Sequence, residues 1–483
     1  MPNGLLWSKR PTLRWNRLIA RGAPLATTKL ISENLAAFAN RVAYKDISPD
    51  AIRRAKYLML DAVGIAFASS RYEFAQRELL ALSGLGGGNS TVVGMPLRLA
   101  LRDALLMNGS LVHGLDFDDT YLPGSMHLTA SAVPCALGVG AHVGASGRDL
   151  LTALAIGMEV SARVAAAGKG AFQQAGFHTT GVVGAFGCTL LAGRLWNLTA
   201  EQMVIAQGIA LSTACGTVQP MLDGTWTKRM HPGWAASSSI TAVAMARQGF
   251  LGPKESYEGK FGLYALYLGE FAKNVDLSVI AAQLGERWEF ARSSVKLFPA
   301  CHQAHAFMNA AIAIAKDHAV EPTGVKSVKA LIAKQGINMV CEPLEVKRAP
   351  QDSYAAQFSL PYTVACCLLR GEFNLADLEP HRLKDARTLE LSRKLEYEVD
   401  PNAGFPKSRS GEIIVTLSNG QELRKRENII PDEPVTDAAI ETKFFANAEM
   451  VMSRSRAQAI MDAILLIEKE ANVARLVESL GAR

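Results

Sequence analysis

The densest run of reactive side chains in this sequence is His113-Gly-Leu-Asp-Phe-Asp-Asp-Thr120, and His127 follows it closely. Its three carboxylates repel one another, so a folded chain must offset them with partners, helix caps or a ligand. One interpretation is a helix end with solvated acids, and another is a pocket in which Asp116, Thr120 and His127 converge on a ligand. The segment also fits the D-x-D-x-T pattern of aspartyl phosphotransferases. That pattern lies on a strand, however, whereas this segment follows a predicted helix.

Two glycine-bounded segments place a basic side chain ahead of a predicted helix. Gly176-Phe-His-Thr-Thr-Gly181 contains His178, and the segment Thr-Lys-Arg-Met-His-Pro-Gly ending at Gly233 contains Lys228. Helix N-termini favour anions, because their amide groups are free and the helix dipole is positive there. A capping histidine and a solvated lysine are the structural interpretations. Binding of a carboxylate is the functional one.

The segment from Lys296 to His305, with the sequence KLFPACHQAH, is compact and chemically varied. The spacing of Cys301, His302 and His305 would allow metal ligation. Zinc, however, is usually held by four ligand groups, and no fourth is evident, so we expect no metal site here. Farther along the chain, Tyr362 opens a helical pattern. It is either an amphipathic core residue or a proton donor at a cleft.

Helical periodicity dominates the first 290 residues. Ser48-Pro-Asp50 combines a capping serine, a proline suited to the first helical position and an early acidic residue, so it predicts a helix over residues 51–69. Apolar side chains at the same spacing predict further helices over residues 99–111, 148–167, 182–195, 200–213 and 235–248.

The pattern changes after about residue 290, where β-branched runs appear. They predict strands over residues 325–333, 413–417 and 422–426, and Asn419-Gly420 is a typical two-residue turn between the last two. Helices are predicted over residues 355–369, 437–452 and 456–480.

The predicted fold class is therefore mostly α, with a large all-helical domain and a smaller α+β lid domain. A chain of 483 residues exceeds the size at which one core usually divides. We assign residues 28–288 together with 433–483 to the helical domain, 289–432 to the lid, and 1–27 to a basic flexible arm.

The charge distribution argues against a nucleic-acid partner. The formal net charge is +6, but six basic residues and no acidic ones lie in the first 32 positions, so the rest of the chain is balanced. A polyphosphate groove needs a basic field on the folded body. The arm has the composition of an organelle transit peptide as well as that of an unstructured bacterial arm. We expect a cytoplasmic protein, with mitochondrial targeting by the arm as the alternative, and no membrane partner.

The seven cysteines are odd in number and form no CxxC pair. This usage is typical of a reducing compartment without structural zinc or ordinary iron–sulfur ligation.

Five ordered motifs together resemble the MmgE/PrpD family, whose members include 2-methylcitrate dehydratase, cis-aconitate decarboxylase and iminodisuccinate epimerase. They are HGLDFDDT with Asn108-Gly109 upstream, GFHTTGVVGAFG, TKRMHPGWAA, KLFPACHQAH and FSLPYTVACCLLRG. The resemblance covers about residues 28–480. It implies a homodimer without metal or organic cofactor, whose substrate, a small di- or tricarboxylic acid, binds between a helical domain and a lid.

The resemblance also implies roles for individual residues. The expected catalytic residues are His127, His178, Lys228, Tyr362 and Asp116, and the expected substrate-binding residues are Thr120, Lys296, Cys301 and His305. In this hypothesis the two lysines hold carboxylates, the two histidines at 127 and 178 move protons, and the tyrosine is a relay.

These residue types suit proton removal alpha to a carboxylate, because the aci-carboxylate that forms carries extra negative charge for a cation to stabilise. The sequence between Thr120 and His127 lacks the acidic, tryptophan-containing stretch expected of methylcitrate dehydratases. Cys301 stands where the decarboxylases place a histidine. We therefore expect a dehydratase-type lyase acting on a different acid. An epimerase, a decarboxylase and a non-catalytic carboxylate-binding protein are the alternatives.

Overall fold

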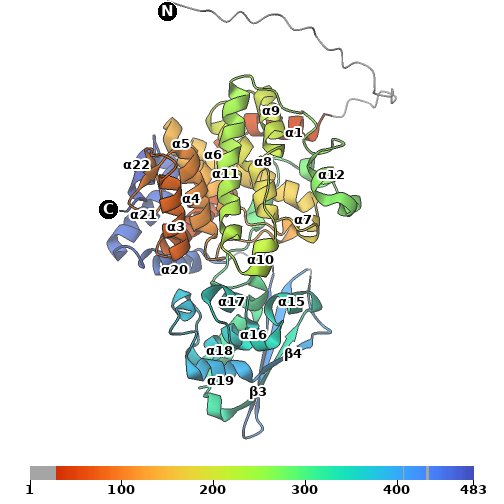
Figure 1. The fold of residues 1–483 in the computed structure, drawn as a ribbon, viewed down its shortest axis with the longest axis vertical. Coiled ribbons are helices and arrows are strands. Elements are labelled where there is room, and N and C mark those ends of the chain that lie inside the picture. The colour runs from red at the N-terminus through yellow and green to blue at the C-terminus, as the bar shows by residue number, and fades with distance from the viewer. Residues whose placement is uncertain (1–28, 406, 431–434, 483) are drawn as a thin grey trace, which may run out of the picture.

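The computed structural model describes residues 29–405, 407–430 and 435–482. The predicted arm over residues 1–27 lies outside this range. The fold is mostly α, with one small mixed sheet in the C-terminal half. Figure 1 shows a helical part at the top and an α+β part below it.

The helical part begins with thirteen α-helices and a two-stranded ribbon. The helices are α1 Ile31–Arg41, α2 Pro49–Ser69, α3 Glu73–Ser83, α4 Leu101–His113, α5 Thr129–Val143, α6 Gly147–Ala167, α7 Ala171–Gln174, α8 Thr179–Leu195, α9 Ala200–Leu211, α10 Gln219–Asp223, α11 Thr227–Arg247, α12 Leu263–Leu268 and α13 Ser278–Ala281. The ribbon is β1 Ser90–Thr91 with β2 Arg98–Leu99. As predicted, Ser48 caps α2, and its hydroxyl accepts from the Ala51 amide at 3.2 Å.

The α+β part contains six helices and four strands. They are α14 His305–Asp317, β3 Val325–Ile332, α15 Ile337–Val340, α16 Leu344–Arg348, α17 Ser353–Gln357, α18 Leu360–Arg370, α19 Ala386–Arg393, β4 Leu395–Val399, β5 Arg409–Leu417 and β6 Glu422–Ile429. The sheet order is β4-β3-β5-β6, in which only β3 and β4 are parallel. The predicted hairpin of β5 and β6 is confirmed. Strand β4 was not predicted, although Leu395-Glu-Tyr-Glu-Val399 alternates as a strand does.

Three helices, α20 Asp437–Ala448, α21 Arg454–Leu465 and α22 Ala474–Ser479, return the chain to the helical part. Helix α20 packs against α2, and α22 packs against α5. In Figure 1 these blue helices lie beside the orange α3, α4 and α5.

Helices α4, α8 and α11 pack against one another in the middle of the helical part. At the crossing of α4 with α11 the backbones nearly touch. A Cβ at Gly109 would lie 2.3 Å from the Gly233 Cα, and a Cβ at Gly233 would lie 2.0 Å from the Leu106 carbonyl oxygen. This close approach fixes the end of α4 relative to the start of α11.

The structure corrects three predicted boundaries. The helix expected over 235–248 begins at Thr227. Pro232 and Gly233, which normally mark the end of a helix, lie inside α11 at its contact with α4. The helix expected over 355–369 is broken into α17 and α18, because Ser359 caps α18 and Pro361 occupies its first turn. The helix expected over 456–480 is broken into α21 and α22.

In the part of the chain that the structure describes, α6 alone is long and apolar enough to cross a membrane, and 94% of its apolar window is buried inside the fold. It is one of the helices that pack against α8.

Candidate active site

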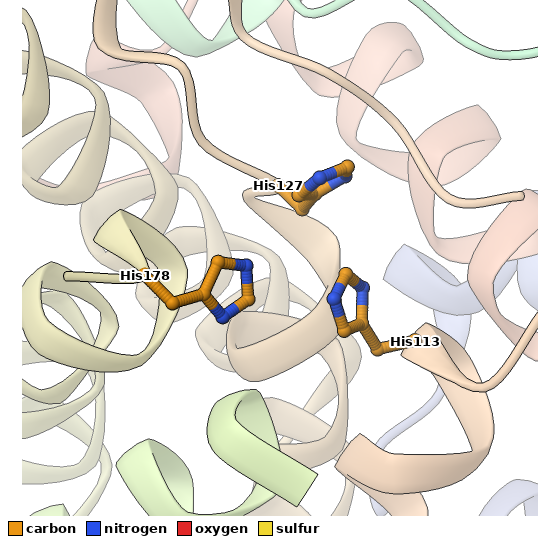
Figure 2. Close-up of side chains that lie close together, drawn as sticks. All are labelled: His113, His127 and His178. Carbon is orange, nitrogen blue, oxygen red and sulfur yellow. The ribbon is translucent and has the colours of Figure 1, made fainter. Parts of the chain in front are cut away.

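Three histidines from three helix ends face one another inside the helical part (Figure 2). His113 is the last residue of α4, His127 lies two residues before α5, and His178 is the N-cap of α8. The ring centroid of His113 lies 4.8 Å from that of His127 and 5.3 Å from that of His178. The packing of α4, α5 and α8 thus gathers three imidazoles that lie up to 65 residues apart in sequence. His113 was part of the predicted motif but was not among the expected site residues.

Each of these rings is oriented by a bond at Nδ1. His113 Nδ1 lies 2.7 Å from Asp118 Oδ2, and His127 Nδ1 donates to the Asp119 carbonyl at 2.7 Å. His178 Nδ1 lies 3.1 Å from His231 Nδ1 on α11. The Nε2 atoms of His113 and His178 are buried and have no partner among the described residues. They are therefore free to meet a ligand.

Burial keeps the three imidazoles neutral. Burial is the main cause that lowers the pKa of His127 to about 3; the charge of Asp118 opposes this shift, and that of Lys296 adds to it. Burial also lowers the pKa of His113 and of His178 well below the usual range, and the charge of Lys228 adds to the effect in both. A neutral imidazole accepts a proton at the nitrogen that carries no hydrogen, so Nε2 is the acceptor in a ring whose Nδ1 donates.

Beside the histidines, Asp116 lies between two lysines. Lys228 Nζ donates to Asp116 Oδ1 at 2.8 Å, and Lys296 Nζ donates to the Asp116 carbonyl at 2.7 Å and lies 3.5 Å from Oδ1. Burial alone would raise the Asp116 pKa, but the two ammonium groups hold it well below its usual range. Burial would likewise lower the Lys228 pKa, but Asp116 outweighs it and raises that pKa. The cluster therefore has two buried cations and one carboxylate.

The other members of the first motif hold the loop in place. Asp119 Oδ1 accepts from the Thr129 amide at 2.9 Å and from the Thr129 hydroxyl at 2.6 Å. Thr120 pairs with Ser294 through both backbone groups, at 2.8 and 2.9 Å. The Thr120 hydroxyl is buried and unpartnered. The pairing fixes the segment that carries Lys296 against the loop that carries Asp116.

Cys301 and His305 lie on the side of the site formed by the α+β part. The Cys301 thiol lies 3.3 Å from the Met339 sulfur, and burial raises its pKa, so it is a neutral thiol. His305 Nε2 lies 3.1 Å from the Ala300 carbonyl oxygen, and burial lowers the pKa of His305 to about 3. Because this nitrogen is already bonded, the contact indicates a structural role for His305.

The structure does not bring Tyr362 to the cluster. Its hydroxyl donates to the Asp377 carbonyl at 2.7 Å, within the α+β part. Tyr354 takes the expected place instead. Its hydroxyl is buried without a partner, and after burial the charges of Lys228 and Asp116 have the largest effects on its pKa. Sequence reasoning missed Tyr354 because it lies just before the helix predicted over residues 355–369 and in none of the five motifs.

Two groups of side chains have the spacing of metal ligands. His113, His127 and His178 each offer a nitrogen, and these atoms all lie within 4.8 Å of one another; His113, Asp116 and Asp118 form the second group. In the second group Asp116 already binds two ammonium ions. Those same charges oppose a divalent cation at the first group.

Comparison with known proteins places these residues in a wider group. The model of the MmgE/PrpD N-terminal domain matches residues 33–276, and that of the MmgE/PrpD C-terminal domain matches residues 298–469. The chain is 27% identical to a cis-aconitate decarboxylase of Homo sapiens, over 91% of this chain and 92% of that protein. It is 25% identical to a cis-aconitate decarboxylase-like protein of Aspergillus oryzae, over 89% and 93%, and 23% identical to a cis-aconitate decarboxylase of Aspergillus terreus, over 93% and 96%.

Proposed function

Because this chain belongs to the MmgE/PrpD family, we propose that it is a dehydratase-type lyase that removes a proton alpha to a carboxylate of a small di- or tricarboxylic acid. The relatives support a lyase or decarboxylase role in general. The observation that carries the finer proposal is the free, neutral Nε2 of His178 within the electrostatic reach of Lys228.

Lys228 and Lys296 supply the binding charge. Both are buried and share the Asp116 carboxylate, so a substrate carboxylate that enters beside them meets two ammonium groups. Charge-assisted bonds to that carboxylate strengthen when the carbanion delocalises into it. The lysines therefore stabilise the transition state more than the ground state.

The proton moves to an imidazole. A bound anionic substrate places negative charge beside the rings and so raises their pKa toward the working range. With its Nδ1–H donated to His231 Nδ1, His178 takes the alpha proton at Nε2, and the electron pair of the C–H bond forms the new C=C bond as hydroxide leaves the neighbouring carbon. The Tyr354 hydroxyl, which has no partner in the structure, protonates the leaving group to give water.

A second candidate is decarboxylation, and the names of the relatives favour it. The same two lysines would hold the remaining carboxylates while CO2 leaves, and a proton would then be delivered to carbon. Cys301, whose thiol is neutral, stands where we expect the decarboxylases to carry a histidine. This difference is the reason why we place decarboxylation second.

Proton NMR in deuterium oxide tests both candidates, with EDTA present and with citrate, 2-methylcitrate, cis-aconitate, malate, tartrate and iminodisuccinate as substrates. We expect alpha deuterium exchange or new vinyl signals from a hydroxy acid, without CO2 release. CO2 release from cis-aconitate would instead identify a decarboxylase. No exchange and no product with any of the six acids would contradict the proposal.

Two variants accompany this experiment. Lys228→Ala should lower turnover at least about 100-fold, because it removes a charged group aimed at the developing oxyanion. Lys329→Ala is the matched control, since Lys329 pairs with Glu398 on the exposed surface of the sheet. Equal activity of the two variants would show that Lys228 lies outside the reaction site.

A further inference from the structure

Arg409 is a partly buried cation without a counter-ion. It is the first residue of β5, and its side chain makes no hydrogen bond or ion pair with the residues that the structure describes. The Nε atom is shielded from solvent. On the neighbouring strand of the same sheet, Arg424 pairs with Glu412 and Arg426 pairs with both Asp400 and Glu412. Arg409 is therefore unlike the arginines of β6, each of which is satisfied by an acid.

An unpaired, desolvated guanidinium is unfavourable for the fold. Burial lowers the pKa of Arg409, yet arginine remains protonated in proteins. Leaving such a charge without a partner costs stability, which an anionic ligand would restore. The position therefore calls for an anion that none of the described residues supplies.

A second unpartnered polar group lies near Arg409. His302 is buried, its Nδ1 has no partner, and its pKa is lowered well below the usual range by burial and then by the charge of Arg409. As a neutral imidazole it donates one N–H. Arg409 also affects Cys301 and His305, whose pKa values respond to Lys296 as well. The His302 ring lies 4.7 Å from that of His305, the first residue of α14, and α14 packs against β5, which begins with Arg409. The two unpartnered groups thus belong to neighbouring elements of the α+β part, and His302 follows Lys296 closely in the chain.

We propose that Arg409 and His302 form a second carboxylate-binding subsite. Arg409 binds the carboxylate through its planar guanidinium, and the neutral imidazole of His302 donates a further hydrogen bond. The inference rests on the proposed function, because it assigns one substrate carboxylate to Lys228 and Lys296 and another to the α+β part. The substrate class is then an acid with at least two carboxylates, of which the second binds to Arg409 at the start of strand β5.

Unreactive acids of one carbon-chain length test this subsite by NMR titration. Glutarate carries two carboxylates, valerate is the same five-carbon chain with one, and tricarballylate adds a third to the glutarate chain. For Arg409→Gln we expect affinity for glutarate and tricarballylate to fall about 10- to 100-fold, as for loss of a charged hydrogen-bonding partner. Affinity for valerate should stay unchanged, because its single carboxylate occupies the lysine subsite.

Arg409→Lys and Arg424→Gln complete the set. The lysine variant should show the same selective loss to a smaller degree, because an ammonium cannot bind a carboxylate in the bidentate way. It also keeps the test valid if the glutamine variant fails to fold. Arg424→Gln removes an exposed arginine from the same sheet and should bind all three acids like the parent protein. Equal weakening of all three acids by both Arg409 variants, or no weakening at all, would overturn the proposal.

Failure of the subsite is distinguishable from failure of the proposed function. The three probes do not react, so the titration reports binding alone. If the parent protein converts an acid in the deuterium experiment but Arg409→Gln binds glutarate normally, only the subsite is wrong. If the selective loss is found but no acid is converted, the subsite remains and the lyase assignment is wrong.

Discussion

Two buried lysines share the Asp116 carboxylate at the centre of the candidate site, and their charges keep that carboxylate ionised. Asp116 has a φ of 50°, an uncommon backbone conformation for a residue with a side chain, and its pKa is held far below the usual range by its two cationic partners. Replacing Asp116 by a neutral residue therefore leaves two buried ammonium groups without the carboxylate that they share.

We predict that Asp116→Asn lowers the free energy of unfolding by about 3–5 kcal/mol, because it leaves two buried ammonium groups without the carboxylate they share. The double variant Asp116→Asn with Lys228→Met should recover part of that stability, because only the Lys296 ammonium is then left without a carboxylate. Turnover should stay low in both. Urea unfolding followed by circular dichroism measures the first effect. Recovered turnover in the double variant would show that the pair is structural only.

Most of the charged site could be predicted residue by residue from the sequence. Asp116, His178, Lys228 and Lys296 lie in the five motifs and His127 follows the first of them, and the structure brings them together. Their types and order in the chain were enough, because each motif stands at a helix end or in a loop between predicted elements. Tyr362 was different, because its hydroxyl is bonded to the Asp377 carbonyl within the α+β part, which the motif alone does not reveal.

Among the elements, α4 and α11 determine the geometry of the site. Helix α4 ends at His113, and α11 begins with Lys228 in its first turn. Their crossing at Gly109 and Gly233 leaves no room for a side chain. Any change in the distance between α4 and α11 therefore moves the His113 imidazole relative to the Lys228 ammonium group.

We predict that Gly109→Ala lowers the free energy of unfolding by about 1–3 kcal/mol through overpacking, and lowers turnover further by separating the two helices. Gly87→Ala is the matched control, because a Cβ there meets no atom within 4 Å. Thermal unfolding and steady-state turnover of both variants are the measurements. If Gly109→Ala unfolds at the same temperature as the control, the close crossing is not a tight constraint.

The boundaries of these elements could be predicted less well than their existence. The helices over 51–69 and 148–167 were predicted to within a few residues, because apolar periodicity and capping agree there. The start of α11 was missed, because Pro232 and Gly233 are helix breakers in isolation and only the contact with α4 explains them. The short strand β4 pairs with β3 across more than 60 residues, which local pattern alone does not reveal.

Across the whole molecule, buried neutral histidines link stability to pH. His127 and His305 have pKa values lowered by burial to about 3, whereas an unfolded histidine titrates near 6.5. The unfolded chain thus binds more protons in this range. The stability that these groups contribute is present above about pH 6.5 and is lost as the pH falls toward 3.

We predict that the melting temperature falls steadily between pH 6.5 and pH 4. Each such histidine contributes at most about 1.4 kcal/mol per pH unit. His305→Gln should flatten this dependence, because an amide nitrogen can still donate to the Ala300 carbonyl but does not titrate. Differential scanning calorimetry across the range measures both proteins. A pH profile that is identical in the variant would contradict a buried, neutral His305.

The return of α20 to α2 has a consequence for how the protein is made. Lys443 on α20 donates to the Phe117 carbonyl at 2.8 Å and pairs with Asp61 of α2 at 2.6 Å, so the loop next to Asp116 is completed by a helix from the last tenth of the chain. On the ribosome, residues 305–430 of the α+β part are synthesised as one continuous stretch. The helical part is incomplete until helices α20 to α22 have also been synthesised. Until translation ends, the apolar face of α2 is open to chaperones and proteases. A premature stop codon near residue 435 would remove α20, α21 and α22, so we expect the truncated chain to be degraded rather than to act as a smaller enzyme.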